Sequence, residues 1–316
     1  MQNPTVSQTA RRTALADWLA SPSNPVTARL MINRIWQHHF GRGIVPTPGD
    51  FGTRGQPPTH PELLDWLAGE FVARGWSVKA MHKLILLSAA YQQSSEPGAD
   101  ALARDPENKL FSRQNRVRLE GEVVRDSLLA ASGRLNPTMG GPGVLPPIPA
   151  DITKTSKNWT TSADPADHAR RSIYIFARRN LRFPFLEAFD APDSNLTCPE
   201  RGRSTTAPQS LTLLNSEEVM EAAKATAAHL LNEAKTDNER IQLAFRLALG
   251  KSAGRKELAL ARDFLQSCGR RREAAQVHSE IVNRKSEIDQ SLLTTKEDFT
   301  ELCRALFNLN AFVYVD

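Results

Sequence analysis

The sequence predicts a mainly α-helical protein, an irregular helical bundle with long ordered loops and a minor β-sheet. Apolar residues recur at helical spacing through much of the chain, and capping residues and glycines bracket those runs. Two segments rich in proline and polar residues, 136–168 and 190–207, interrupt the helices. The apolar run at 172–178 is the best strand candidate, and we expect its partner strand within 144–163.

The first third of the chain predicts three helices. An Asn-Pro pair at residues 24–25 is typical of a helix start, and Gly41 ends the apolar stripe that follows. A T-x-x-E capping box at residues 59–62 precedes the second helix. Ser77 is the expected N-cap of the third helix.

The remainder predicts one helix over 118–132, with Leu119, Val123, Leu128 and Ala131 facing inward, and a further series near the C-terminus. The expected C-terminal helices start at Asn215 and Asp237 and cover 255–268, 270–290 and 296–309, before an extended FVYVD end. We expect a single domain over residues 11–316, or two helical lobes, 11–214 with the minor sheet and 215–316 all-helical.

Composition excludes several classes of protein. The chain of 316 residues is 40% hydrophobic and 24% charged, which is typical of a globular protein. It has no apolar run of about 20 residues, so we expect no membrane span, and its start lacks the apolar core of a signal peptide. The net charge of +5 is spread along the chain without an aromatic-studded basic motif, so we expect no nucleic-acid partner.

Cysteine spacing argues against several cofactors. The three cysteines include no C-x-x-C pair, which disfavours a zinc ribbon, a thioredoxin-type motif and c-type haem attachment. We therefore expect no metal and no cofactor in this chain.

Two adjacent histidines, His38 and His39, are the first candidate site. Neighbouring helical residues point about 100° apart, so both cannot easily bind one metal ion. His39 shares the apolar stripe of Ile32, Ile35 and Trp36, which favours a core histidine with one hydrogen bond. Contact with a substrate or partner stays open as the alternative, and metal binding is the least favoured of the three.

The polar stretch 185–215 is the second candidate site. Its aspartates and asparagines can build turns by bonding nearby backbone amides. Alternatively, Asp190 and Asp193 could form a polar pocket with Arg178 and Arg203, suited to acid/base chemistry or to an anionic group. The candidate catalytic residues are Asp190, Asp193 and His38. The candidate binding residues are Arg178, Arg179, Asn180, Asn195, Cys198, Arg203, Gln209 and His39.

Several long motifs resemble one known family. They include NPVTARLMINRIWQHHFGRGIVPTPGDFG, RLEGEVVRDSLLAASGRLNPTMGGPGV, RRSIYIFARRN, AFDAPDSN and LFNLNAFVYVD. Together they resemble the planctomycete-specific domain of unknown function 1553, over nearly the whole chain. The resemblance implies the C-terminal part of a larger exported protein that also carries a cytochrome c domain, and hence an extracytoplasmic location. It implies no known activity.

Three functions are compatible with these observations. The first is a non-enzymatic binding or docking module, since long loops on a rigid scaffold are where binding sites usually occur. Its partners would be other domains of a larger exported protein, or a saccharide. The second is a hydrolase-like domain acting on a sulfated or anionic saccharide, with Asp190 or Asp193 as acid/base. The third is a redox-partner domain that receives a cytochrome against Trp36 or Trp159.

Overall fold

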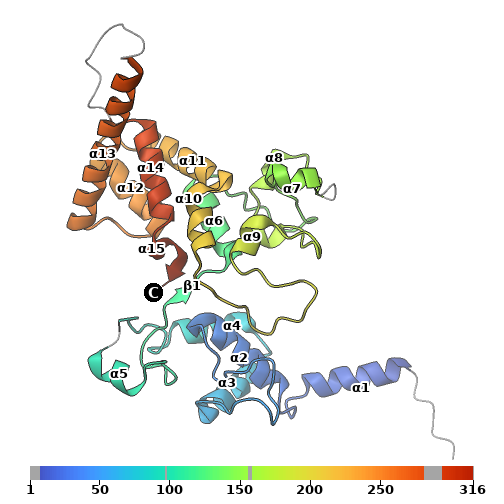
Figure 1. Ribbon diagram of the computed structural model, residues 1–316. Coiled ribbons are helices and arrows are strands. Elements are labelled where there is room, and N and C mark those ends of the chain that lie inside the picture. The colour runs from blue at the N-terminus through green and yellow to red at the C-terminus, as the bar shows by residue number, and fades with distance from the viewer. Residues whose placement is uncertain (1–7, 97, 156–158, 281–293, 316) are drawn as a thin grey trace, which may run out of the picture. The chain divides into compact units, whose positions relative to one another are not determined.

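The computed structural model describes residues 8–96, 98–155, 159–280 and 294–315, and helices dominate it (Figure 1). The mainly α-helical fold class is confirmed, because the regular sheet in these ranges has two strands of two residues each. The chain divides into two compact units, one up to Val117 and one over Arg118–Val315. None of the helices in the described ranges combines the length and apolar character needed to cross a membrane.

The first unit is built on three helices with a shared apolar core. Its helices are α1 (Gln8–Ala20), α2 (Thr27–Phe40), α3 (Pro61–Ala73), α4 (Val78–Leu86) and the short α5 (Ala99–Arg104). Ile32 and Phe40 of α2, Phe71 of α3 and Met81 of α4 are almost fully buried. Trp36 stacks on Phe40 with ring centroids 4.1 Å apart, which adds a preferred aromatic geometry to the burial.

The predicted helix starts of this unit are partly right. Ser77 caps α4, since its side chain accepts a hydrogen bond from Ala80 N at 3.2 Å. Asn24 accepts from two backbone amides at the start of α2, although the helix itself begins at Thr27. The expected capping box at 59–62 is not formed, because the cap position of α3 is His60.

The second unit is a larger helical assembly with irregular segments on it. Its elements are β1 (Val117–Arg118), α6 (Gly121–Ala131), α7 (Ala150–Thr155), α8 (Pro165–His168), the 3₁₀ turn η1 (Ser172–Tyr174), α9 (Pro184–Ala188), α10 (Ala207–Asn215), α11 (Glu217–Glu233), α12 (Asp237–Leu249), α13 (Arg255–Glu280), α14 (Lys296–Phe307), α15 (Asn310–Val313) and β2 (Tyr314–Val315). The strands β1 and β2 pair, and Leu119 N donates to Val313 O at 2.8 Å next to them.

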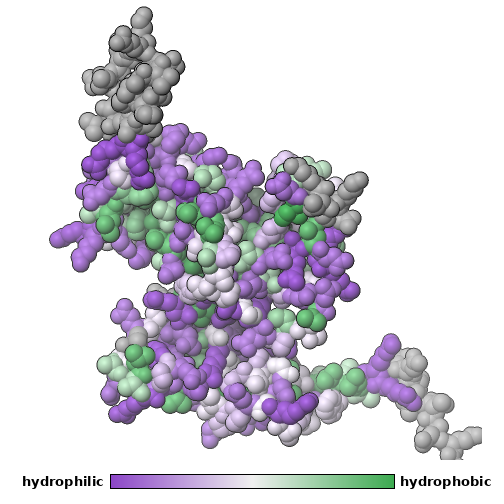
Figure 2. All heavy atoms as spheres, viewed as in Figure 1, coloured by the Kyte–Doolittle hydropathy of each residue, from purple (hydrophilic) through white to green (hydrophobic). Residues whose placement is uncertain are grey.

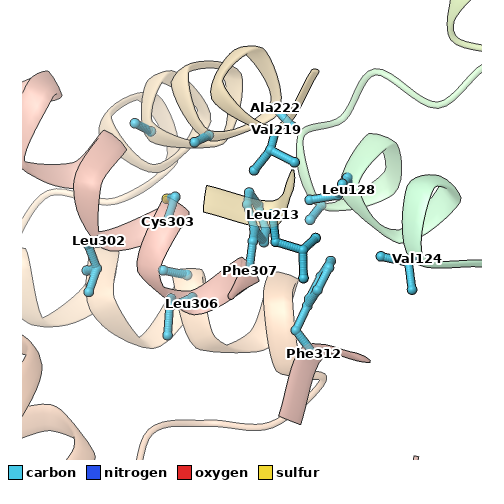
Figure 3. Close-up of a cluster of buried hydrophobic side chains, with 14 of the residues drawn as sticks. Val124, Leu128, Leu213, Val219, Ala222, Leu302, Cys303, Leu306, Phe307 and Phe312 are labelled. Atoms are coloured by element: carbon cyan, nitrogen blue, oxygen red, sulfur yellow. The ribbon is translucent and has the colours of Figure 1, made fainter. Parts of the chain in front are cut away.

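The core of the second unit lies where α6, α10, α11 and α14 meet (Figure 3). Val219 of α11, Phe299 and Phe307 of α14, and Leu128 of α6 are fully buried there. Each such side chain contributes roughly 1.5–3 kcal/mol through burial, so this contact stabilises the unit.

Arg125 is an unexpected member of this interior. Its side chain is 1% exposed, and its guanidinium donates to Glu218 Oε1 at 2.5 Å and to His168 O at 2.7 Å. Further donors reach Arg170 O at 3.2 Å and Ser172 Oγ at 3.3 Å. A buried charge is tolerated only when it is paired and hydrogen-bonded in this way. Arg125 therefore ties α6 to α11 and to the chain at 168–172.

The predicted strand at 172–178 is wrong as a sheet strand. Ser172–Tyr174 forms the 3₁₀ turn η1, and only an isolated parallel bridge joins Ile175 to Val144. Val144 lies within 144–163, where a partner strand is predicted, but the described residues of that range form no strand. Because Ser172–Tyr174 turns into the 3₁₀ helix η1, a single bridge at Ile175 forms instead of a ladder. The minor sheet forms instead between β1 and the C-terminal β2.

Other boundaries also differ from the expectations. Ser216 caps α11 and Thr236 caps α12, each one residue away from the predicted cap. Val123 is 43% exposed, so the buried face of α6 is rotated from the predicted one. The helix α13 continues through Gly269, where a stop was expected.

The boundary between the two compact units lies between Val117 and Arg118. The two-lobe alternative places it between residues 214 and 215. The helices α10 and α11, on either side of that position, both lie in the second unit. Whether the chain is one evolutionary domain stays a prediction.

Candidate functional site

The polar loop, residues 190–207, is organised around the carboxylate of Asp190. This residue follows α9 and Phe189, and its φ of 62° lies in the left-handed region that aspartate tolerates better than most residues. Its Oδ2 accepts from Ser204 N at 2.8 Å, and its Oδ1 accepts from Ser204 Oγ at 2.7 Å. Gln209 Nε2 donates to the same Oδ2 at 3.2 Å. Asp190, at the start of the polar loop, thus binds Ser204 near the end of the same loop.

Arg118 completes this cluster from the β1 strand. Its guanidinium donates to Gln209 Oε1 at 2.6 Å and to the carbonyl oxygen of Ser204. The guanidinium carbon also lies 5.4 Å from the centre of the Phe189 ring, a cation–π distance. Gln209 is 3% exposed and serves at the same time as the third residue of a capping box with Thr206 at the start of α10. We call these four residues, Asp190, Ser204, Gln209 and Arg118, the Asp190 clasp.

The electrostatics of the clasp keep Asp190 ionised. Burial raises the pKa of its carboxyl group, but hydrogen bonds from Ser204 and Gln209 and the charge of Arg118 together lower the pKa below its ordinary value. A general acid needs a raised pKa near the working pH. Asp190 is therefore suited to hold structure and poorly suited to donate a proton.

Asp193 has different partners and builds a turn. Its Oδ1 accepts from the backbone N and the side-chain amide of Asn195, both at 2.9 Å. Its other oxygen lies 3.4 Å from Arg182, which joins the polar loop to the segment before α9. The hydrogen bond from Asn195 N, with smaller help from the Asn195 side chain and Arg182, lowers the pKa of Asp193. The two aspartates share no hydrogen-bond partner in the described part of the chain.

Arg201 anchors the middle of the polar loop to the start of α6. It lies 2.8 Å from Glu122 and 3.2 Å from Glu120, in half-buried ion pairs. Burial lowers the pKa of Arg201, but the bond to Glu122 and the charges of both glutamates give a net rise, so the cation is firmly held. The loop is therefore fixed at two points, by Arg201 and by the Asp190 clasp.

The space around the clasp is small. A cavity of about 10 Å³ lies between Arg118, Phe189, Asp190 and Arg201, which is room for about one water molecule. Beside it, residues 200–203 line an open depression of about 410 Å³. A ligand can approach the loop surface in that depression, but the cavity has no room for a substrate beside the Asp190 carboxylate.

Of the predicted binding arginines, Arg203 lies on this loop, and Arg178 and Arg179 lie in the segment before α9. Arg179, Asn180 and Arg203 are exposed, and Arg178 is half-buried. Among the described residues, none of the three arginines forms an ion pair, unlike Arg182 and Arg201 nearby. Three cations are therefore free to bind an anionic group.

The other predicted site residues have structural roles or lie apart from the clasp. Asn195 bonds Asp193, and Gln209 belongs to the clasp. Cys198 is exposed and its thiol contacts Glu200 O at 3.1 Å; it forms no disulfide, nor do the other two cysteines. No group of three or more His, Cys, Asp or Glu side chains in the described ranges is arranged to hold a metal ion.

His38 and His39 belong to the first unit. His38 is exposed, whereas His39 is half-buried with its Nε2 2.7 Å from Nδ1 of His82 on α4. The His39 ring also meets Tyr91 edge-on, with centroids 5.5 Å apart. Burial, then the neighbouring charges of His82 and His38, lowers the pKa of His39. His39 is thus a half-buried histidine with one hydrogen bond to His82, and its contact with a substrate or partner stays a prediction.

Sequence reasoning missed Arg118, Glu120, Glu122 and Ser204. In the stretch RLEGE at the start of α6, charged and uncharged residues alternate, and Arg201, which pairs with its two glutamates, lies far along the chain. That pattern was the available signal for these residues. Their pairing with a residue some 80 positions away depends on how the chain folds, which the pattern does not reveal.

Comparison with known proteins places the chain in one family. No curated protein and no solved structure matches it. A family model described as a protein of unknown function, DUF1553, matches residues 11–265. That match covers most of the chain, and the chain therefore belongs to the DUF1553 family.

Proposed function

We propose that this protein is a binding module that recognises a sulfated or otherwise anionic saccharide through Arg178, Arg179 and Arg203. One observation carries the proposal. The carboxylate of Asp190 is engaged in closing the polar loop, while these three arginines have no acidic partner among the described residues. The loop is thus a fixed support that carries Arg203, and Arg178 and Arg179 in the segment before α9 likewise form no ion pair in the described part of the chain.

The chemistry of arginine suits this ligand. The guanidinium presents donors in a planar fork that matches two oxygens of a sulfate or carboxylate. Phe176, at 49% exposure just before Arg178, adds an apolar ring on which a sugar face can rest. A rigid loop also loses little conformational entropy on binding, which favours affinity.

The alternatives have less support. A hydrolase of the same saccharide needs a carboxyl group with a raised pKa, and the pKa values of Asp190 and Asp193 are both lowered. A cytochrome docking against Trp36 or Trp159 needs an exposed ring, and both rings are 5% exposed. Export, and association with a cytochrome-bearing protein, are part of the proposal because the family resemblance implies them.

Binding of a fluorescent sulfated oligosaccharide, followed by anisotropy, tests the proposal. We expect saturable binding that weakens as salt rises, and no binding of a neutral dextran oligosaccharide of the same length. The triple variant R178A/R179A/R203A should lose at least about tenfold in affinity. The matched control R54A/K79A/R104A removes the same charge from exposed positions of the first unit and should bind nearly as wild type. If both variants lost the same affinity, the loss would reflect net charge alone, and a site at the loop would be refuted.

A further inference from the structure

The helix α1 presents an apolar stripe that none of the described residues of its unit covers. Leu15, Trp18 and Leu19 stand at i, i+3 and i+4, and they are 55%, 56% and 43% exposed. Arg11 and Arg12 precede Leu15 by one turn and extend the same face with positive charge. Figure 2 shows apolar side chains on this helix open to solvent. The face is therefore apolar with a basic end.

The exposed face of α3 has the opposite character. Trp66 is 54% exposed at its centre, with Glu62 and Glu70 one turn before and after it. Gly69 lies on the same face, and a side chain added there would meet nothing within 4 Å. Glu70 is paired with Arg74 at 2.8 Å, whereas Glu62 forms no ion pair among the described residues. The face is therefore apolar with an acidic end at Glu62, and its small residue leaves room for a large ring from another helix.

The link between α1 and α2 is organised by Asn24. Asn24, 6% exposed, donates through its amide to Trp18 O at 3.2 Å. Its oxygen accepts from Val26 N at 2.9 Å and Thr27 N at 3.0 Å. One buried side chain thus joins the last turn of α1 to the first turn of α2 and sets the direction in which α1 leaves the unit (Figure 1).

From this charge complementarity we infer that the chain forms a symmetric dimer in which α1 of each copy packs on α3 of the other. Twofold symmetry makes the contact twice, which doubles the area buried by a single short helix pair. Trp18 and Trp66 supply the apolar centre, and Arg11 and Arg12 face Glu62 and Glu70. A helix of this length is marginal alone in water, so a partner also stabilises α1 itself. This inference is independent of the proposed saccharide binding.

Sedimentation velocity of the full chain over a wide concentration range tests the inference. We expect a reversible monomer–dimer equilibrium, and the Trp18→Ala variant should weaken it by about tenfold or more. A chain that stays monomeric up to roughly 100 µM, a concentration that would reveal even a weak dimer, overturns the inference. If α1 packed within its own chain instead, the sedimentation coefficient would not depend on concentration.

Charge exchange gives the sharper test. The variants R11E/R12E and E62K/E70K should each weaken the dimer, because each places like charges across both helix pairs. An equimolar mixture of the two should restore dimers as heterodimers, because each α1 then meets an α3 of opposite charge. All four positions are exposed or half-exposed, and far-UV circular dichroism checks that both variants keep their helices. Failure of the mixture to recover dimer overturns the α1–α3 contact, even if the wild type dimerises elsewhere.

Discussion

Replacing Asp190 tests whether its carboxylate holds the second unit together. Asp190→Ala removes three accepted hydrogen bonds, two from Ser204 and one from Gln209. A hydrogen bond to an ionised partner contributes about 1.5–3 kcal/mol, but Asp190 is half-exposed and the three bonds are not independent. We expect the second unit to lose about 2–4 kcal/mol of unfolding free energy, including about 1 kcal/mol because alanine disfavours the left-handed backbone of residue 190.

Two companion variants separate these causes. Asp190→Asn keeps one accepting oxygen and tolerates the left-handed backbone, so it should cost about half as much, roughly 1–2 kcal/mol. Asp190→Gly removes the carboxylate but relieves the backbone, so it should be less harmful than alanine by about 1 kcal/mol. The order from mildest to most harmful is therefore Asn, Gly, Ala.

Labelling of Cys303 measures the effect in the right unit. This thiol is 1% exposed in the core of the second unit, and burial raises its pKa to about 12, so it reacts only when the unit opens. Peptide-resolved mass spectrometry distinguishes it from Cys198 and Cys268. A loss of about 2.8 kcal/mol corresponds to roughly a hundredfold faster labelling. If Asp190→Ala changed the labelling rate by less than about twofold, the carboxylate would contribute nothing to stability and the structural role would be refuted.

Three further outcomes follow from the same contacts. Arg125→Met should destabilise the second unit by about 3–5 kcal/mol, and Arg125→Lys by less, in urea titrations; equal stability would contradict the buried network. Gly121→Ala should cost about 1–3 kcal/mol in the same titration, because its new Cβ would lie 2.8 Å from Phe189 Cβ, and a stabilised variant would show that α6 has room to move. Acidification should destabilise the first unit, because burial and then the charge of His82 lower the pKa of His39 in the folded state. The folded state therefore favours neutral His39. The stability that neutral His39 contributes is fully present above the ordinary histidine pKa of about 6.5 and is lost as pH falls through the lowered pKa. His39→Gln should flatten this pH dependence in thermal melts, and an unchanged slope would rule out His39 as its source.

The sequence predicted the helical class well because periodicity and caps are local signals. The stripe of α2, the Ser77 cap and the left-handed Gly41 after α2 all follow from neighbouring residues. The helix α1 went unrecognised because its apolar face spans little more than one turn. Where a local signal was ambiguous, as in the apolar run at 172–178, a 3₁₀ turn formed in place of the expected strand.

The candidate site was predicted in its residues but not in its connections. Asp190, Asp193, Gln209 and Asn195 were all singled out, and the turn-building alternative describes how Asp193 and Asn195 bond. Arg118 escaped notice because it bonds residues 86 and 91 positions away in sequence. Contacts at that separation depend on how the helices pack.

Hydrogen exchange at Ser204 tests the central claim that the polar loop has a fixed, structural core. The Ser204 amide donates to Asp190 Oδ2 at 2.8 Å, whereas Gly202 lies exposed two residues earlier. In the wild-type protein we expect Ser204 to exchange at least about a hundredfold more slowly than Gly202, and Asp190→Ala to remove that difference. Equally fast exchange at both amides in the wild type would show that the clasp does not hold the loop, and the account built on it would be wrong.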